Sequence, residues 1–178
     1  ELSHIILHYT DMDSAQAALE RMCDPAAKVS AHYLIHRDGQ IVQLVEESRR
    51  AWHAGVASWR GESDMNSASI GIELDHQGHD AQGQMAAFPK AQRKALYALL
   101  KDIITRNNLD PHHVIGHSDI APGRKVDPGE AFDWAELHEA GFGLWLGQVK
   151  QEAVAEVPSD DATAQKAILP LQKALAAF

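Results

Sequence analysis

The chain has 178 residues, 45% of them hydrophobic, which suits one compact domain with length left over for an appendage. Its formal net charge of −9 argues against a nucleic-acid partner, because phosphates would be repelled and no basic cluster offsets the charge. No stretch approaches the roughly 20 apolar residues of a membrane-spanning helix, and the single cysteine, Cys23, excludes a thiolate cage around a metal.

Alternating and helical hydrophobic periods follow one another along the chain and predict a mixture of strands and helices. An Asp38-Gly39 pair between two alternating runs predicts a hairpin turn. Residues 90–106 carry an apolar stripe at helical spacing, which should lie on a sheet. In chain order, the predicted elements are strand 3–9, helix 13–23, strands 31–37, 40–45 and 69–75, helix 90–106, strand 113–117 and helix 133–140. The predicted fold class is therefore α/β, with a central mixed β-sheet flanked by helices.

The composition changes beyond Gly147. Residues 148–161 are polar, which is typical of a linker. Residues 162–178 form an amphipathic helical pattern that Pro170 kinks or restarts. The predicted organisation is a catalytic domain at 1–147, a linker at 148–161 and a C-terminal helical extension at 162–178.

Imidazole and carboxylate side chains occur in two predicted strands and one loop. His8 lies in the first strand, Glu73 lies in the fourth, and His117 and Asp127 lie at the two ends of one connecting segment. Structural zinc is usually closed by four protein ligands, whereas catalytic zinc keeps one position open for water. Two histidines and one aspartate leave such a position, so these residues predict a hydrolytic zinc site.

A hydrolytic zinc site also needs a base, and alternation in the strand 69–75 indicates Glu73. The two faces of this strand divide into Ile70, Ile72 and Leu74 on one side and Ser69, Gly71, Glu73 and Asp75 on the other. The apolar side should enter the core. Gly71 should then leave the space beside Glu73 uncrowded.

Lys125 precedes Asp127 by two positions. If Val126 points inward along an extended stretch, Lys125 and Asp127 project together on the other side. The ammonium group would then lie beside the metal and stabilise the oxyanion that forms when a carbonyl is attacked. In other enzymes such a donor is worth roughly 3–4 kcal/mol.

Five motifs, in the same order as in a known family, carry a resemblance. They are His8-Tyr-Thr, Ser30-Ala-His-Tyr-Leu-Ile, Ala51-Trp-His-Ala-Gly55, Ser69-Ile-Gly-Ile-Glu-Leu and His117-Ser-Asp-Ile-Ala-Pro-Gly-Arg-Lys-Val-Asp-Pro-Gly. They resemble the zinc N-acetylmuramoyl-L-alanine amidases with the peptidoglycan-recognition-protein and phage-lysozyme-like fold. The resemblance implies one Zn²⁺ per chain, held by His8, His117 and Asp127. It also implies that Glu73 is the catalytic carboxylate and that Lys125 stabilises the transition state.

Two positions narrow this resemblance. Ala31 stands where relatives that read Gly-Tyr-His-Phe have a tyrosine near the metal, so Glu73 would act as the base alone. Asp127 stands where phage and animal relatives often have cysteine. Both features resemble the bacterial AmiD and AmpD types, and the Trp-Arg-Gly at 59–61 resembles the AmiD-type envelope enzymes more than the cytoplasmic recycling enzymes.

The AmiD-type resemblance implies a peptidoglycan or muropeptide substrate and a periplasmic location. We also expect the protein to be a monomer. The chain begins at Glu1 without a methionine, so an upstream segment that anchors the protein to the outer membrane is one expectation, and a cytoplasmic location is the alternative. Residues 171–178 resemble the opening helix of the small cell-wall-binding modules attached to such amidases. The extension is then either a truncated module or a helix that packs on the catalytic domain.

Residues 50–66 form a long connection, and connections of this length are usually functional. We expect it to form one wall of the substrate groove. The candidate substrate-binding residues are Trp52, His53, Arg60 and Asn66. Aromatic faces suit sugar rings, and Arg60 would pair with a carboxylate of the peptide stem.

Three functions from different classes follow from these observations. The first is zinc-dependent hydrolysis of the amide between N-acetylmuramic acid and L-alanine. The second is a non-catalytic peptidoglycan receptor of the same fold, which predicts the loss of a ligand or of the base, and none is missing from the sequence. The third is a zinc peptidase or deacetylase that acts on another substrate, which the chemistry of the site alone leaves open.

Overall fold

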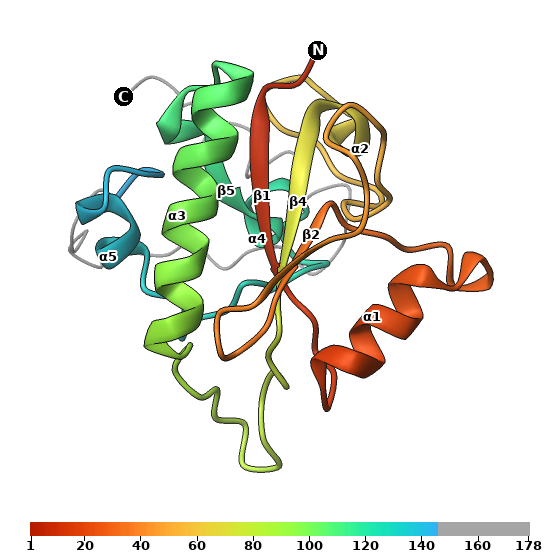
Figure 1. Ribbon diagram of the computed structural model, residues 1–178, viewed down its shortest axis with the longest axis vertical. Coiled ribbons are helices and arrows are strands. Elements are labelled where there is room, and N and C mark those ends of the chain that lie inside the picture. The colour runs from red at the N-terminus through yellow and green to blue at the C-terminus, as the bar shows by residue number, and fades with distance from the viewer. Residues whose placement is uncertain (146–178) are drawn as a thin grey trace.

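The computed structural model describes residues 1–145, which fold into a five-stranded sheet packed against helices (Figure 1). The strands are β1 (His4–Tyr9), β2 (Tyr33–Ile35), β3 (Ile41–Gln43), β4 (Ser69–Leu74) and β5 (Val114–Gly116). The helices are α1 (Ala15–Cys23), α2 (Met65–Ala68), α3 (Lys90–Asn107), α4 (His117–Ile120) and α5 (Trp134–Glu139), with 3-10 turns at Pro25–Ala27 and Pro111–His113. The predicted linker at 148–161 and extension at 162–178 lie outside the described residues.

The sheet has the strand order β3-β2-β4-β1-β5. β1 runs parallel to both β4 and β5, β2 runs parallel to β4, and only the β2–β3 pair is antiparallel. The carboxyl ends of β1, β4 and β5 therefore meet at one edge of the sheet. The register places His8 directly beside Glu73 on adjacent strands.

Each face of the sheet has its own apolar cluster. On one face, Ile70 and Ile72 pack with the buried side of α3, which lies across the sheet in Figure 1. On the other face, Ile6 packs with residues of the loop 50–66 and with Met65 and Ile120 of the short helices. His8 and Glu73 share this second face by the period of two, so the loop 50–66 covers the same face as the candidate site.

The predicted mixed sheet and its helices are confirmed, and the strands are mostly shorter than expected. The hairpin turn is also confirmed, because Tyr33 pairs with Gln43 across the antiparallel strands. Gly39 at this turn has φ +92°, and a Cβ there would lie 2.9 Å from the carbonyl oxygen of Ala91. The sequence did not predict α2 and α4, since helices of one turn are too short to show a hydrophobic period.

A polar cluster joins the loop after β3 to the end of α3. The Glu47 carboxylate accepts hydrogen bonds from Tyr33 Oη at 2.6 Å, Asn107 Nδ2 at 2.6 Å and the Arg106 guanidinium. Burial alone would raise the pKa of Glu47, but the hydrogen bonds from Arg106, Tyr33 and Asn107 outweigh burial and lower it to about 2. Ionised Glu47 therefore stabilises the fold.

Glu47→Ala is expected to lower the free energy of unfolding by about 2 kcal/mol at pH 7, which is within the usual range for hydrogen bonds to a charged group. A folded-state pKa below the unfolded one adds stability that is present above about pH 4.5 and is lost as the pH falls toward 2. Urea unfolding at several pH values measures the difference from wild type. Glu46→Ala, which removes only an exposed pair with Arg49, should change stability by less than about 0.5 kcal/mol. A gap that stays constant from pH 7 to pH 3 would contradict this account.

Candidate metal centre

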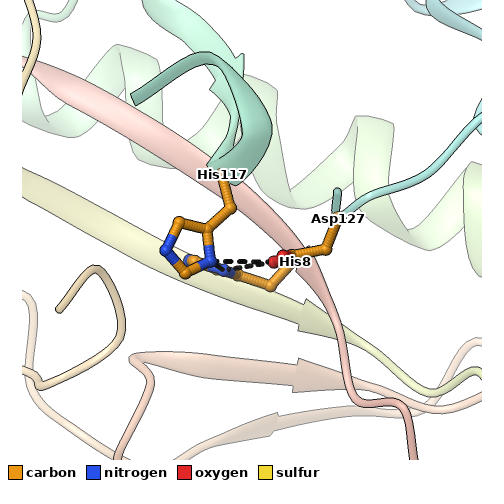
Figure 2. A group of neighbouring side chains, drawn as sticks. All are labelled: His8, His117 and Asp127. Atoms are coloured by element: carbon orange, nitrogen blue, oxygen red, sulfur yellow. Dashed lines mark hydrogen bonds and ion pairs between the residues drawn. The ribbon is translucent and has the colours of Figure 1, made fainter. Parts of the chain in front are cut away.

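Three side chains from distant parts of the chain converge at the carboxyl edge of the sheet (Figure 2). His8 Nδ1, His117 Nδ1 and Asp127 Oδ2 form a triangle in which each pair of atoms is 2.9 Å apart. All three residues are buried. These are the three residues that the sequence analysis assigned to a metal site. Within residues 1–145 they are the one group of three or more His, Cys, Asp or Glu side chains whose donor atoms lie close enough together to hold an ion.

Each of the three residues is placed by the element before it. His8 lies near the end of β1, and His117 is the first residue of α4, which follows β5 without a break. Asp127 closes the loop after α4, where its carbonyl oxygen accepts a hydrogen bond from Ser118 N at 2.9 Å. Two strand ends and one closed loop thus bring donors more than 100 positions apart to one point.

The hydrogen bonds behind the two imidazoles decide where their protons lie. His117 Nε2 lies 2.9 Å from the carbonyl oxygen of Ala54, which can only accept, so this nitrogen carries a proton and Nδ1 is the nitrogen left to bind an ion. His8 Nε2 lies 2.9 Å from His53 Nδ1, and a proton on His8 Nε2 gives the same tautomer. In this tautomer the three converging atoms can all act as acceptors, an arrangement that a cation stabilises, whereas without a cation a proton on either Nδ1 would donate to the Asp127 carboxylate.

The charges of the site agree with this assignment. Burial, the nearby His117 and Lys125 lower the pKa of His8 to about 4, against the opposing effect of Asp127, so His8 is neutral at pH 7. Burial disfavours ionisation of Asp127, but hydrogen bonds with His117 and His8 outweigh burial and hold its pKa well below the usual range. A neutral imidazole and an anionic carboxylate are the ligand states that zinc requires. Two nitrogens and one oxygen also leave a fourth position open, so the donor set fits catalytic zinc.

Glu73 lies beside His8 and faces the same space. Its Oε2 atom is buried and has no hydrogen-bond partner in the described part of the chain. Burial, with repulsion from Asp127, raises the pKa of Glu73 to about 8, and Lys125 opposes this rise. A carboxyl group that changes protonation near neutral pH is suited to transfer protons.

The space over Gly71 differs from the prediction. We expected it to be uncrowded, but the His53 ring fills it, and a Cβ on Gly71 would lie 2.4 Å from His53 Cγ. The predicted division of β4 into two faces is otherwise observed, since Ile70, Ile72 and Leu74 are all in the core. Periodicity assigns the face of a strand, but it does not show which distant side chain covers that face.

The extended geometry expected around Lys125 is wrong. The amide nitrogens of Arg124 and Lys125 both donate to the Ala121 carbonyl oxygen, at 3.1 and 3.0 Å, so the loop turns back on itself. Val126 is consequently 63% exposed and does not point inward. Lys125 is exposed and, with Asp127, still lines the space next to the metal triangle.

The triangle and Glu73 lie in a groove of about 420 Å³. The lining residues come from the end of β1, α1, the loop before β2, residues 52–53 and the loop 124–127. Sequence reasoning missed the wall formed by α1, including Arg21 and Met22. A helix that follows the His8 strand directly must start at the same edge of the sheet, and this connection was the available signal.

The loop 50–66 contributes less to the groove than predicted. Two of its residues line the groove: Trp52, which is 53% exposed, and His53. Arg60 is not among the lining residues, since it lies in a tight turn closed by the Trp59–Glu62 backbone pair. Trp59 is buried in the core and presents no face to a ligand.

Asn66 also lies outside the groove lining. Its Oδ1 atom accepts hydrogen bonds from the backbone nitrogens of His53 and Ala54, at 2.9 and 2.8 Å. Arg124, which sequence reasoning did not single out, donates to the carbonyl oxygens of Ala54 and Val56, at 2.8 and 2.5 Å. Both side chains therefore hold the loop that stands behind the two histidines.

Comparison with known proteins agrees with the geometry. The N-acetylmuramoyl-L-alanine amidase family matches residues 1–130 of this chain. The N-acetylmuramoyl-L-alanine amidase AmiD of Escherichia coli K12 is 42% identical over 153 residues, which cover 79% of this chain and 54% of AmiD. The 1,6-anhydro-N-acetylmuramyl-L-alanine amidase AmpD of Citrobacter freundii is 49% identical over 110 residues, covering 62% of this chain and 56% of AmpD. The chain thus spans about half the length of these relatives.

A solved structure of E. coli AmiD, in complex with its substrate anhydro-N-acetylmuramic acid-L-Ala-D-gamma-Glu-L-Lys, superimposes with a TM-score of 0.78. The identity is 36%, and the match covers 94% of this chain and 70% of that one. The predicted fold class and the predicted family are both confirmed. This chain belongs to the N-acetylmuramoyl-L-alanine amidase family.

Proposed function

We propose that this chain is a zinc-dependent hydrolase of the amide bond between N-acetylmuramic acid and L-alanine in peptidoglycan. The observation that carries the proposal is the triangle of two imidazole nitrogens and one carboxylate oxygen, 2.9 Å apart, with Glu73, whose Oε2 atom has no hydrogen-bond partner among the described residues, facing the same groove. Family membership supports the choice of this amide over other zinc-dependent hydrolyses.

The chain's own residues divide the work of the reaction. Zinc held by His8, His117 and Asp127 would supply Lewis acidity, which polarises a carbonyl and lowers the pKa of water. Glu73 takes the proton of the attacking water at a carboxylate oxygen and delivers it to the leaving nitrogen. Lys125 donates from Nζ to the carbonyl oxygen as negative charge develops there.

The substrate is expected to be a muropeptide or intact peptidoglycan. The ligand of the E. coli AmiD structure contains a γ-linked glutamate, which keeps a free α-carboxylate. Three cations that form no ion pair among residues 1–145 line the groove: Arg21, Lys125 and Arg124, the last of which donates to backbone carbonyl oxygens. In a chain with a net charge of −9, unpaired cations in the groove support an anionic substrate.

Arg21→Ala is expected to raise KM about fivefold, with little change in kcat, because a partly exposed ion pair is worth about 1 kcal/mol. The effect should disappear with a muropeptide whose glutamate α-carboxylate is amidated. Steady-state kinetics on both substrates measure this, with Lys101→Ala on α3 as the control. An equal loss with both substrates would show that Arg21 does not contact this carboxylate.

We also propose that the enzyme acts as a monomer in the periplasm. One chain supplies the three converging donor atoms and Glu73, so the proposed reaction requires no residue from a second copy. Likeness to AmiD supports the location, and no helix within residues 1–145 is long and apolar enough to cross a membrane. Sedimentation of the purified protein and fractionation of expressing cells test the two statements.

Digestion of intact sacculi and of anhydromuropeptides, with zinc and after chelation, tests the reaction. We expect zinc-dependent release of stem peptides with a free N-terminal L-alanine, while the glycan strands stay intact. Binding without cleavage would indicate a receptor, cleavage inside the stem a peptidase, and release of acetate a deacetylase. Each of these three outcomes would overturn the proposed reaction.

A further inference from the structure

The outer nitrogens of the two histidines of the metal triangle, His8 and His117, rest on one dipeptide, His53-Ala54. His8 Nε2 meets His53 Nδ1 at 2.9 Å, and His117 Nε2 meets the carbonyl oxygen of Ala54 at 2.9 Å. Two consecutive residues therefore accept the hydrogen bonds from the Nε2 atoms of His8 and His117. His53 accepts through its side chain, and Ala54 accepts through its backbone carbonyl oxygen. Partners of this kind fix the orientation and the tautomer of a metal-binding histidine.

The dipeptide is itself held from two sides. Asn66 Oδ1 accepts hydrogen bonds from both of its backbone nitrogens, at 2.9 and 2.8 Å. From the opposite side, Arg124 donates to the Ala54 carbonyl oxygen at 2.8 Å, so this oxygen also accepts from a side chain other than His117. The position of the dipeptide is thus set by hydrogen bonds that do not include the metal-binding atoms.

The His53 ring is placed by the strand beneath it. It lies flat against Gly71 of β4, where a Cβ would come within 2.4 Å of His53 Cγ and 2.6 Å of its Nδ1. Separations below 3.0 Å require something to move. The His32 ring meets the His53 ring edge-on at a centroid distance of 5.7 Å, while His32 Nδ1 accepts the Gly71 amide proton at 2.9 Å. Position 71 of β4 therefore requires glycine, because any side chain there would overlap the His53 ring.

We propose that His53 and Asn66 are positioning residues for the metal site, and that Gly71 is required because it makes room for His53. They hold the His8 and His117 rings so that both Nδ1 atoms face the centre of the triangle, and they act on the metal site through these rings. The inference rests on the proposed function only in taking zinc as the ion. It gives a role that the sequence did not predict to Asn66, which lies outside the groove lining, and to His53, which belongs to it.

Asn66→Ala in the full chain tests the first part. Loss of the shared acceptor is expected to weaken zinc binding 10-fold or more, the usual effect of removing a residue that orients a metal ligand. Asn66→Asp keeps an accepting oxygen at the same place and should stay within about threefold of wild type. Zinc affinity is measured by competition with a chromophoric chelator, and the Co²⁺ absorption spectrum reports whether the ligand geometry is kept. Wild-type affinity in Asn66→Ala would overturn the proposal.

A double-mutant cycle between Gly71 and His53 tests the second part. Gly71→Ala should weaken zinc binding about as much as His53→Ala, although Gly71 touches no metal ligand. In the His53→Ala background the ring is gone, so adding Gly71→Ala should change the affinity by less than about twofold. Additive losses would show that Gly71 acts by another route. Thermal unfolding of the metal-free variants separates a loss of fold from a loss of positioning, and if Gly71→Ala fails to fold, the Asn66 pair still decides.

Wild-type zinc binding separates this inference from the proposed function. If wild type binds zinc and the variants bind it equally well, the positioning roles are wrong and the amidase proposal stands. If wild type binds zinc and the variants weaken as expected, but stem peptides are not released, only the proposed reaction fails. If wild type binds no zinc, both fail.

Discussion

Asp127→Ala is expected to abolish both zinc binding and amide hydrolysis. Asp127 supplies one of the three converging donor atoms and the only negative charge of the triangle. Two imidazoles alone form a weak site, so zinc affinity should fall by at least 100-fold and turnover should fall to background. Metal analysis after dialysis and release of stem peptides measure the two effects.

The stability of the protein gives a second measurement of the same change. A ligand that binds only the folded state, present at about 100 times its Kd, adds about 2.7 kcal/mol, which corresponds to a rise in Tm of about 5–10 °C for a domain of this size. Zinc should produce this rise in wild type but not in Asp127→Ala. Asp13→Ala removes an exposed carboxylate outside the site and should keep the rise. Full activity in zinc-depleted Asp127→Ala would exclude the proposed metal centre.

The ligand set could be predicted because its residues lie where the chain leaves regular elements. His8 ends an alternating strand, and the segment that starts at His117 follows another, so parallel pairing of β1 with β5 brings them to one edge. The position of Glu73 could be predicted in the same way, because β4 also runs parallel to β1 and places Glu73 beside His8. These predictions needed only the period of two and the fact that parallel strands end on the same side.

Features of the site that depend on the path of a loop could not be predicted in this way. The turn around Arg124 exposes Val126, and the loop 50–66 folds back so that His53 covers Gly71. Asn66 was assigned to the groove because it is polar and lies in a long loop, but its oxygen binds backbone nitrogens instead. Contacts between segments far apart in sequence set these positions, and local periodicity carries no information about them.

Glu73→Gln is expected to lower kcat by about 10³-fold, within the usual range for loss of a general acid or base, while zinc affinity stays within about threefold of wild type. The amide has the same shape as the carboxylate, but it cannot take the proton of the attacking water. Glu73 Oε2 has no hydrogen-bond partner among the described residues, so the substitution breaks no contact that holds the fold together. Single-turnover kinetics and the chelator competition provide the two numbers.

The split between kcat and zinc affinity distinguishes the role of Glu73 from that of Asp127. Asp127 is buried and Glu73 is partly buried, and their pKa values shift in opposite directions. Despite burial, His117 and His8 hold the pKa of Asp127 well below its usual range, whereas burial is the largest cause that raises the pKa of Glu73 to about 8. A carboxylate held ionised is suited to bind a cation, whereas one that gains and loses a proton near neutral pH is suited to transfer it. Loss of zinc in Glu73→Gln would make Glu73 part of the metal site, and retention of wild-type kcat would remove it from the mechanism. Only loss of turnover with the metal retained fits a base that acts beside the ion without binding it.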